Sequence, residues 1–356
     1  MEKLGIDFSK EFDGEFQGKR VLVTGHTGFK GSWLSVWLLM LGCEVIGYAL
    51  DPITSLDNFV LCGLKDKVTD IRGDIRDKKH LNEVFEAYKP EIVFHLAAQP
   101  IVRTSYSLPS ETFETNIMGT VNILECVRNS DCVKACIIVT SDKCYENREQ
   151  IWGYREDDPL GGFDPYSASK GCAEIVSSAY RRSYYMAVSS VRAGNVIGGG
   201  DWSNQRIIPD CIRALQKSEA IEVRNPDSVR PWQFVLEPLY GYLLTASKML
   251  ADPIKYSGAW NFGPDFDSIV SVSHIAKKVI EIWGSGQWKD MSGSHAPHEA
   301  GLLNLDCTKS KTYLGFRQRL SLEDTLKQTL EWYKEYKNGN VLEICVKQIE
   351  NYCRLI

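Results

Sequence analysis

Tyr166 and Lys170 lie four positions apart in a stretch with helical periodicity, so we expect their side chains on one helix face, a turn apart. An ammonium group beside a phenol favours the phenolate, which can accept a proton near neutral pH. The pattern Y-x-x-x-K is weak alone, and Tyr333 and Lys337 repeat it in a helix with an ordinary amphipathic pattern. Only Tyr166 opens a helix downstream of a strand that ends in polar residues. We therefore predict proton transfer at Tyr166 and core packing at Tyr333.

Ser141, Asp142 and Lys143 follow directly on an apolar run at 135–139 that is typical of a buried strand. Open α/β sheets bind ligands at the carboxyl ends of their strands. An adjacent acid and amine at that place can donate and accept protons. The alternative is an ordinary ion pair of Asp142 and Lys143 at the protein surface.

The segment R-V-L-V-T-G-H-T-G-F-K-G-S-W-L at 20–34 indicates a strand, a glycine-rich turn and the start of an apolar helix, as in a dinucleotide-binding βα unit. Gly25 would form the turn, Gly28 would let backbone N–H groups reach a pyrophosphate, and Gly31 would let helix and strand pack closely. The helix N-terminus adds partial positive charge. Because the glycine spacing is a variant of G-x-G-x-x-G, ordinary turn glycines remain the alternative.

Asp51 ends the next predicted strand, about 20 residues beyond the glycines, where a carboxylate would hold a ribose 2′-hydroxyl. A carboxylate repels a 2′-phosphate, so this position favours NAD over NADP. The alternative for Asp51 is a helix cap before Pro52.

Strand and helix signals alternate through the first half of the chain, which predicts a doubly wound parallel Rossmann sheet. The predicted strands and helices lie at 44–50, 67–71, 78–88, 91–96, 111–129, 135–139, 165–185 and 187–192. Beyond residue 198 helices predominate, at 237–250, 272–284, 321–337 and 341–352, with a short strand at 221–223. We expect a dinucleotide-binding domain at 1–195, completed by segments from about 232–270, and a smaller, mainly helical domain at 196–356 that lies over the ligand-binding edge of the sheet.

Composition excludes several classes of protein. The 356 residues are 44% hydrophobic with a net charge of −5, which fits a soluble globular protein without a basic surface for nucleic acid or anionic membrane. No apolar run is long enough for a transmembrane helix, and 1–18 lacks a signal-peptide core. The eleven cysteines include no C-x-x-C and the six histidines no H-E-x-x-H, so we expect free thiols, a cytoplasmic location and no metal site.

Together these segments resemble the extended short-chain dehydrogenase/reductases that act on nucleotide sugars. The resemblance rests on T-G-H-T-G-F-K-G, H-L-A-A-Q-P, R-A-G-N-V-I-G-G-G-D-W and the set Ser141, Tyr166 and Lys170. Within that family the chain is similar to the nucleoside-diphosphate-glucose 4,6-dehydratases. The CDP-glucose branch is the most similar in the motifs G-H-T-G-F-K-G, S-D-K-C-Y-E-N and R-P-W-Q-F-V-L-E-P-L. The match runs from about residue 18 to the last helices.

The resemblance implies an NAD-dependent lyase that oxidises a hexose at C4, removes water across C5 and C6, and returns the hydride to C6. Tyr166 would take the C4 hydroxyl proton, Ser141 would position the C4 oxygen, and Asp142 would protonate the leaving hydroxyl. The better-known dTDP branch has glutamate where this chain has Lys143. Lys143 is therefore either the C5 base, if neutral, or a fixed cation that stabilises the enolate, and both roles stay open.

The resemblance also implies two sets of binding residues. Those for the cofactor are Gly25, Thr27, Gly28, Phe29, Lys30, Gly31, Asp51, Asp74, Ile75, Leu96, Ala97, Asn116, Tyr166 and Lys170. Those for the substrate are Gln99, Tyr145, Asn195, Arg206, Arg230 and His298. Arg230 is the strongest phosphate ligand among them, since a guanidinium group matches diphosphate geometry. Local packing is the alternative for Gln99 and Tyr145, and we expect Arg224 to be solvated.

The resemblance further implies a homodimer or homotetramer built on two helices per subunit, and a place in deoxysugar synthesis for surface polysaccharide such as lipopolysaccharide O-antigen. Two other functions remain open. One is a nucleotide-sugar epimerase of the same fold, and the other is a non-catalytic NAD-binding sensor.

Overall fold

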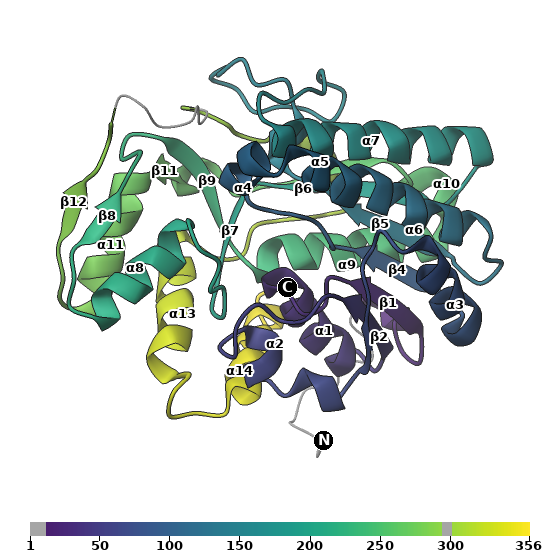
Figure 1. Ribbon diagram of the computed structural model, residues 1–356, viewed down its shortest axis with the longest axis horizontal. Coiled ribbons are helices and arrows are strands. Elements are labelled where there is room, and N and C mark those ends of the chain that lie inside the picture. Colours follow the sequence, from purple (N-terminus) through teal and green to yellow (C-terminus); the bar gives the residue numbers. More distant parts are fainter. Residues whose placement is uncertain (1–11, 294–300) are drawn as a thin grey trace.

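The computed structural model describes residues 12–293 and 301–356. A seven-stranded sheet with the order β10-β6-β5-β4-β1-β2-β3 forms its centre (Figure 1), and all of its neighbouring strands run parallel. The strands are β1 Arg20–Thr24, β2 Glu44–Ala49, β3 Thr69–Arg72, β4 Ile92–His95, β5 Ala135–Val139, β6 Val188–Ala193 and β10 Ala259–Phe262. The order reverses between β1 and β4, which is the place where open α/β sheets bind ligands. The predicted doubly wound parallel fold is confirmed.

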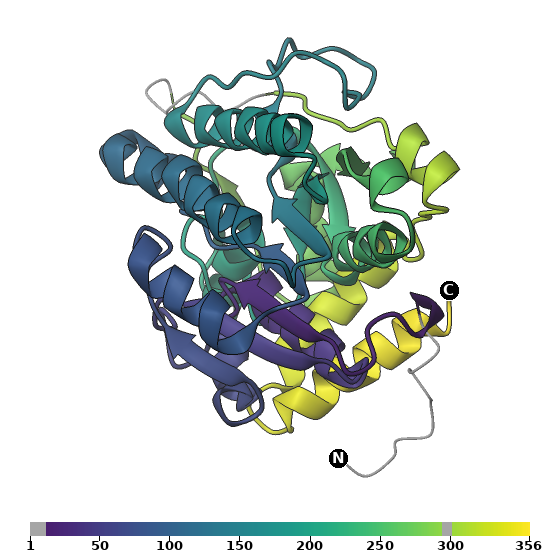
Figure 2. The same ribbon diagram turned by 90° about the vertical axis from the view of Figure 1, so that its right-hand side faces the viewer.

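Helices cover both faces of this sheet because alternate side chains of each strand point to opposite faces. Leu22 and Val93 belong to the core on one face, and Val23 and Phe94 belong to the core on the other. The helices on the first face are α3 Lys78–Tyr88, α6 Gly119–Arg128 and α7 Pro165–Tyr184. Those on the second are α1 Phe29–Met40 and α9 Leu236–Ala251, as Figures 1 and 2 show.

The second half of the chain forms a smaller region beside the sheet, at the left of Figure 1. Its strands are β7 Asn195–Ile197, β8 Ile221–Val223, β9 Val229–Phe234, β11 Ile269–Ser271 and β12 Trp288–Asp290. Its helices are α8 Ile207–Gln216, α11 Val272–Trp283 and α13 Leu322–Glu335. Besides α9, two further elements of the second half join the first region: β10 pairs with β6 in the large sheet, and α14 Val341–Cys353 packs against α1.

The shorter helices are α2 Asn58–Leu61, α4 Val102–Ser107, α5 Pro109–Phe113, α10 Pro253–Tyr256 and α12 Thr308–Tyr313. The long helix expected at 111–129 is not regular, because a π-helical turn, Glu114–Met118, separates α5 from α6. The strand expected at 67–71 lies instead at Thr69–Arg72, after a short 3₁₀ turn, Leu64–Asp66. All eleven cysteines are free. Within the described ranges, the structure has no helix of the length and apolarity that crossing a membrane requires.

The glycine turn between β1 and α1 packs too closely for most side chains. Gly25 has a φ of +73°, and a Cβ there would lie 2.8 Å from the Ala97 backbone nitrogen. A Cβ on Gly31 would lie 2.1 Å from the Gly25 carbonyl oxygen, whereas one on Gly28 would have its nearest neighbour at 3.4 Å. The first turn of α1 therefore lies directly on the preceding loop, as the sequence predicted for Gly31.

We predict that Gly31→Ala destabilises the protein by about 1–3 kcal/mol, because backbone on both sides must move to admit the methyl group. The measurement is urea denaturation followed by circular dichroism. Gly28→Ala is the matched control and is expected to change the free energy of unfolding by less than about 1 kcal/mol. Equal stability of the Gly31→Ala variant and the parent protein would contradict this packing.

Candidate active site

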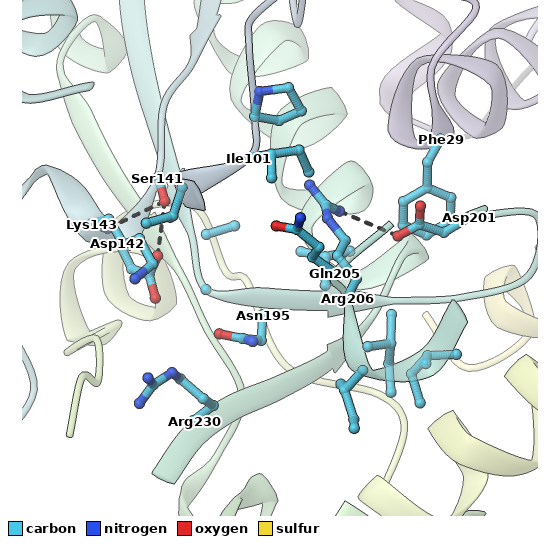
Figure 3. A pocket seen from close by; sticks show the side chains of 18 of the residues that line it. Phe29, Ile101, Ser141, Asp142, Lys143, Asn195, Asp201, Gln205, Arg206 and Arg230 are labelled. Carbon is cyan, nitrogen blue, oxygen red and sulfur yellow. Dashed lines mark hydrogen bonds and ion pairs between the residues drawn. The ribbon is translucent and has the colours of Figure 1, made fainter. Parts of the chain in front are cut away.

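A cavity of about 320 Å³ opens at the carboxyl ends of β4 and β5. Its walls come from the first turn of α1, the segment after β5, the start of α7, the 194–198 segment, α8 and β9. Figure 3 shows Ser141, Asp142 and Lys143 on one side of this cavity, with Arg206 and Asp201 across from them. The large sheet and the second region thus each supply part of the lining.

Ser141 and Asp142 form the end of the cavity next to β5. The Ser141 hydroxyl donates to Asp142 Oδ1 at 2.9 Å and accepts from the Lys143 backbone N–H at 3.2 Å, which caps the 3₁₀ turn Asp142–Cys144. Burial raises the pKa of Asp142, although Lys143 and Arg230 offset part of the shift. A carboxyl group with a raised pKa is a suitable proton donor. Asp142 is buried, so the surface ion pair considered above does not describe it.

Tyr166 and Lys170 line the same cavity from α7, whose N-cap Asp164 accepts from the Ser167 backbone N–H. Burial raises the pKa of Tyr166 to about 12, and a hydrogen bond with Ser141 and the charge of Arg206 offset only part of this. Lys170 Nζ donates to the Val139 carbonyl at 3.1 Å. In this structure burial is the largest influence on the pKa of Tyr166, and Lys170 is not among the groups that lower it.

Lys30 extends from the first turn of α1 into the cavity. Burial, together with the charges of Lys170 and Arg206, lowers its pKa to about 7, while Asp142 opposes the shift. Its ammonium nitrogen lies 5.9 Å from the centre of the Tyr242 ring. Sequence analysis placed Lys30 in the glycine turn but gave no indication that it faces Asp142 and Lys170.

Asn195, Arg206 and Arg230 line the cavity beyond Ser141 (Figure 3). Arg230 donates to the carbonyls of Val229 and Gly301 at 2.9 and 3.2 Å, which fixes its guanidinium group. Arg206 pairs with the buried Asp201 at 3.3 Å. The three substrate candidates from the second region are thus brought together, and His298 lies outside the described residues.

Gln99 and Tyr145 are absent from the lining, because local partners hold them. Gln99 Nε2 donates to the Thr112 hydroxyl at 2.9 Å and its Oε1 accepts from the Ile101 N–H at 2.6 Å. Tyr145 is buried, its hydroxyl donates to Asn261 Oδ1 at 2.8 Å, and Arg192 donates to that hydroxyl at 2.6 Å. The packing alternative describes both residues, which corrects the expectation that they touch the sugar.

The turn around Gly25, Gly28 and Gly31 fits a pyrophosphate. The N-cap residue of α1, Gly28, has no side chain to cap the helix, which leaves backbone N–H groups at its N-terminus for a ligand. The Thr27 hydroxyl, in the same turn, donates to the Leu50 carbonyl at 3.0 Å. Phe29 and Leu96 line the cavity next to it.

The remaining cofactor candidates differ in their surroundings. Asp51 is exposed at the end of β2, 3.4 Å from Arg72, so a ribose can reach it. Asp74 accepts from the Arg76 side chain, which holds the pKa of that carboxyl below its usual range. Of the other candidates, Ile75 and Asn116 are buried and Ala97 is partly buried. The Asn116 side chain is bonded to the Gln99 backbone and to Ser169 Oγ, so it braces the π-helical turn and does not line the cavity.

Several lining residues were missed by sequence analysis, among them Asp201 and Arg224. Asp201, which pairs with Arg206, belongs to the motif R-A-G-N-V-I-G-G-G-D-W. Its place in that motif, five residues before Arg206, was the sequence signal that could have identified it. Arg224, expected to be solvated, lines the cavity and pairs with Asp210 at 3.3 Å. Among the described residues, no three His, Cys, Asp or Glu side chains are grouped to hold a metal ion.

Three comparisons bear on this site. Residues 22–329 match the family model described as GDP-mannose 4,6 dehydratase. The chain is 48% identical over 347 residues to CDP-glucose 4,6-dehydratase of Salmonella typhimurium, covering 95% of this chain and 97% of that protein. A dTDP-glucose 4,6-dehydratase structure from Streptomyces venezuelae, solved with NAD bound, has a TM-score of 0.77 at 24% identity and covers 89% of this chain and 97% of that one. At 24% identity, this structural similarity shows that the two chains share a fold.

We predict that Lys30→Met stabilises the protein at pH 6 and that the gain shrinks as the pH rises toward 10. The unfolded chain holds the Lys30 proton up to an ordinary pKa of 10.5, whereas the folded protein releases it near 7. Between these values the unfolded state binds more protons, so this residue makes stability rise with pH. Urea denaturation at several pH values measures the effect, with the exposed Lys79→Met as control. Parallel pH profiles for the parent protein and Lys30→Met would refute the assignment.

Proposed function

The chain belongs to the GDP-mannose 4,6 dehydratase family, and from that membership we propose that it is an NAD-dependent lyase that converts CDP-glucose to CDP-4-keto-6-deoxyglucose and water. The observation that carries this proposal is the buried Asp142 beside Lys143, in the same cavity as Ser141 and Tyr166. Oxidation and reduction at one carbon need only the serine, tyrosine and lysine. An elimination needs a second proton donor and acceptor, and Asp142 and Lys143 supply them.

NAD fits the glycine turn and the open N-terminus of α1. When bound, it would accept a hydride from C4 and give it back at C6. Gly25, Gly28 and Gly31 would hold the pyrophosphate, and Asp51 would accept from the adenosine ribose. Lys170, whose pKa burial lowers to about 8, would hold the nicotinamide ribose while it is protonated.

Ser141 would hold the C4 oxygen while Tyr166 takes its proton. The Ser141 hydrogen bond and the Arg206 charge both favour the phenolate that this step requires. Asp142, whose pKa burial raises, would donate a proton to the departing C6 hydroxyl. Lys143 would either remove the C5 proton or stabilise the enolate as a cation, and the geometry allows both roles.

Arg230, Arg206 and Asn195 would bind the diphosphate of the substrate. Arg230 is buried, and a guanidinium group held by two carbonyls is preorganised for two phosphate oxygens. Cytidine as the nucleoside rests on the Salmonella relative and its printed name.

We further propose a cytoplasmic homodimer or homotetramer that supplies a deoxysugar for surface polysaccharide. The free cysteines suit a reducing compartment. Ile175 on α7 and Met118 in the turn before α6 are 58% and 50% exposed, as expected for an interface made by two helices of each subunit. Light scattering is expected to give at least twice the mass of one chain, and Ile175→Glu to reduce it. A monomeric parent protein would reject the dimer.

The test of function is a product assay with purified protein and CDP-, dTDP-, UDP- and GDP-glucose. A 4-keto-6-deoxy product absorbs near-ultraviolet light in alkali, whereas an epimer does not. We expect this absorption with CDP-glucose, and mass loss of one water. An epimer without loss of water would replace the dehydratase with an epimerase, and NAD binding without any turnover would favour a sensor.

We predict that Asp142→Asn lowers the elimination rate by about 10²-fold or more, because an amide cannot donate the proton, while oxidation at C4 continues. The measurement is single-turnover formation of reduced cofactor against formation of the final product. Tyr166→Phe is the contrasting variant, since it should prevent the oxidation itself. An unchanged elimination rate in Asp142→Asn would remove Asp142 from the mechanism.

A further inference from the structure

A buried ion pair lies directly behind the cavity, and none of the roles proposed above uses it. Glu174 of α7 and Arg192 of β6 are within 2.7 Å of each other, with side chains 2% and 3% exposed. Neither residue lines the cavity. Glu174 also accepts from the hydroxyls of Thr140 and Ser190 at 2.5 and 2.6 Å. Although burial favours its protonation, these partners hold the pKa of Glu174 below its ordinary value, so it is charged.

Glu174 continues the row that Tyr166 and Lys170 begin, since the three are spaced by four along α7 and share one helix face. This row contacts the end of β5 and the residue after it. Lys170 donates to the Val139 carbonyl, and Glu174 accepts from Thr140, which directly precedes Ser141. The position of the Ser141 hydroxyl therefore depends on contacts made one and two turns farther along the helix.

Arg192 holds the other end of the same segment. It donates to the Tyr145 hydroxyl at 2.6 Å and to the Glu156 carbonyl at 3.0 Å, and its guanidinium carbon lies 4.8 Å from the centre of the Tyr145 ring. Thr140 and Tyr145 flank the residues from Ser141 to Cys144. One buried pair thus fixes both ends of the segment that carries Ser141, Asp142 and Lys143.

Stability alone is a weak reason for this arrangement. Withdrawing two charges from water is costly, and apolar replacements of a buried ion pair are often neutral or stabilising. Thr140 would need only a neutral acceptor. A charged carboxylate one turn beyond Lys170 acts in addition on the ammonium group of that lysine.

We propose that Glu174 is a positioning residue for the dehydratase site, whose carboxylate fixes the Ser141–Lys143 segment through Thr140 and keeps Lys170 charged, without touching the substrate. This inference rests on the proposed function. The charged and titratable groups that act on Lys170 are Glu174 on its own helix, Cys144 from the 3₁₀ turn, Lys30 from α1 and His95 from β4. Burial lowers the pKa of Lys170 to about 8, while Glu174 opposes that shift.

The test compares kcat, KM and the pH profile of the parent protein with those of Glu174→Gln and Glu174→Gln/Arg192→Met. The double variant leaves no unpaired buried charge, so it is expected to fold. We expect kcat to fall by about 100-fold in both, with KM changed less than about threefold, because the reacting groups are displaced while the phosphate contacts are kept. We also expect the alkaline limb to move about one unit to lower pH, since Lys170 loses its proton more easily.

Thr140→Val separates the two effects, because it removes the hydrogen bond from Thr140 to Glu174 and keeps the charges of Glu174 and Arg192. It should lower kcat and leave the alkaline limb in place. Glu125→Gln is the matched control, since Glu125 also pairs with an arginine and accepts from a tyrosine, Arg128 and Tyr180, but lies away from the cavity. It should match the parent protein in kcat and pH profile. A folded double variant with parental kcat and profile would overturn the proposal.

A second readout does not depend on turnover. The pH dependence of Lys170 acetylation by acetic anhydride, followed by mass spectrometry, reports the pKa of that lysine directly. Glu174→Gln should shift its midpoint to lower pH. If the parent protein shows no dehydration while this shift is present, the proposed function fails and the effect of Glu174 on Lys170 stands. If dehydration occurs and the midpoint is unchanged, the inference about Lys170 fails alone.

Discussion

Asp142, Tyr166, Lys170 and Glu174 are withdrawn from water where α7 crosses the carboxyl end of β5. Loss of hydration is the largest influence on each of them, and it favours the neutral form of every one. Among these four groups, only Glu174 has enough partners to hold its pKa below the ordinary value, so its carboxylate stays charged. The site is therefore a set of acids and bases whose proton affinities are set by packing first and by neighbouring charges second.

That packing requires close approach of backbone segments. The first turn of α1 lies on the Gly25 loop, and α7 lies against the end of β5, so both helices deliver side chains to one cavity. Because the sheet order reverses between β1 and β4, the carboxyl ends of neighbouring strands open toward the same space. The second region then covers this space with Arg206 and Arg230.

Local patterns in the sequence were enough to predict most of the fold and a group of polar residues that share one cavity. Alternating strand and helix signals indicated the parallel sheet, and Ser141, Asp142, Lys143, Tyr166 and Lys170 do line one cavity. The errors concern what surrounds a residue. Tyr145 and Gln99 look like ligand contacts in their motifs, yet hydrogen bonds with Arg192 and Thr112 hold them in the packing. The pKa of Tyr166 likewise depends on burial, which the spacing to Lys170 does not reveal.

β10 adds a further constraint, because it forms the edge of the sheet next to β6. More than sixty residues, from Gly194 to Gly258, separate these two strands in sequence. Nearly all of that intervening chain belongs to the second region and to α9. During synthesis the edge of β6 therefore stays open until the ribosome has released the greater part of both regions. The two halves cannot mature one after the other as independent modules, and a nascent chain must protect that unpaired edge from neighbouring strands until its last partner arrives.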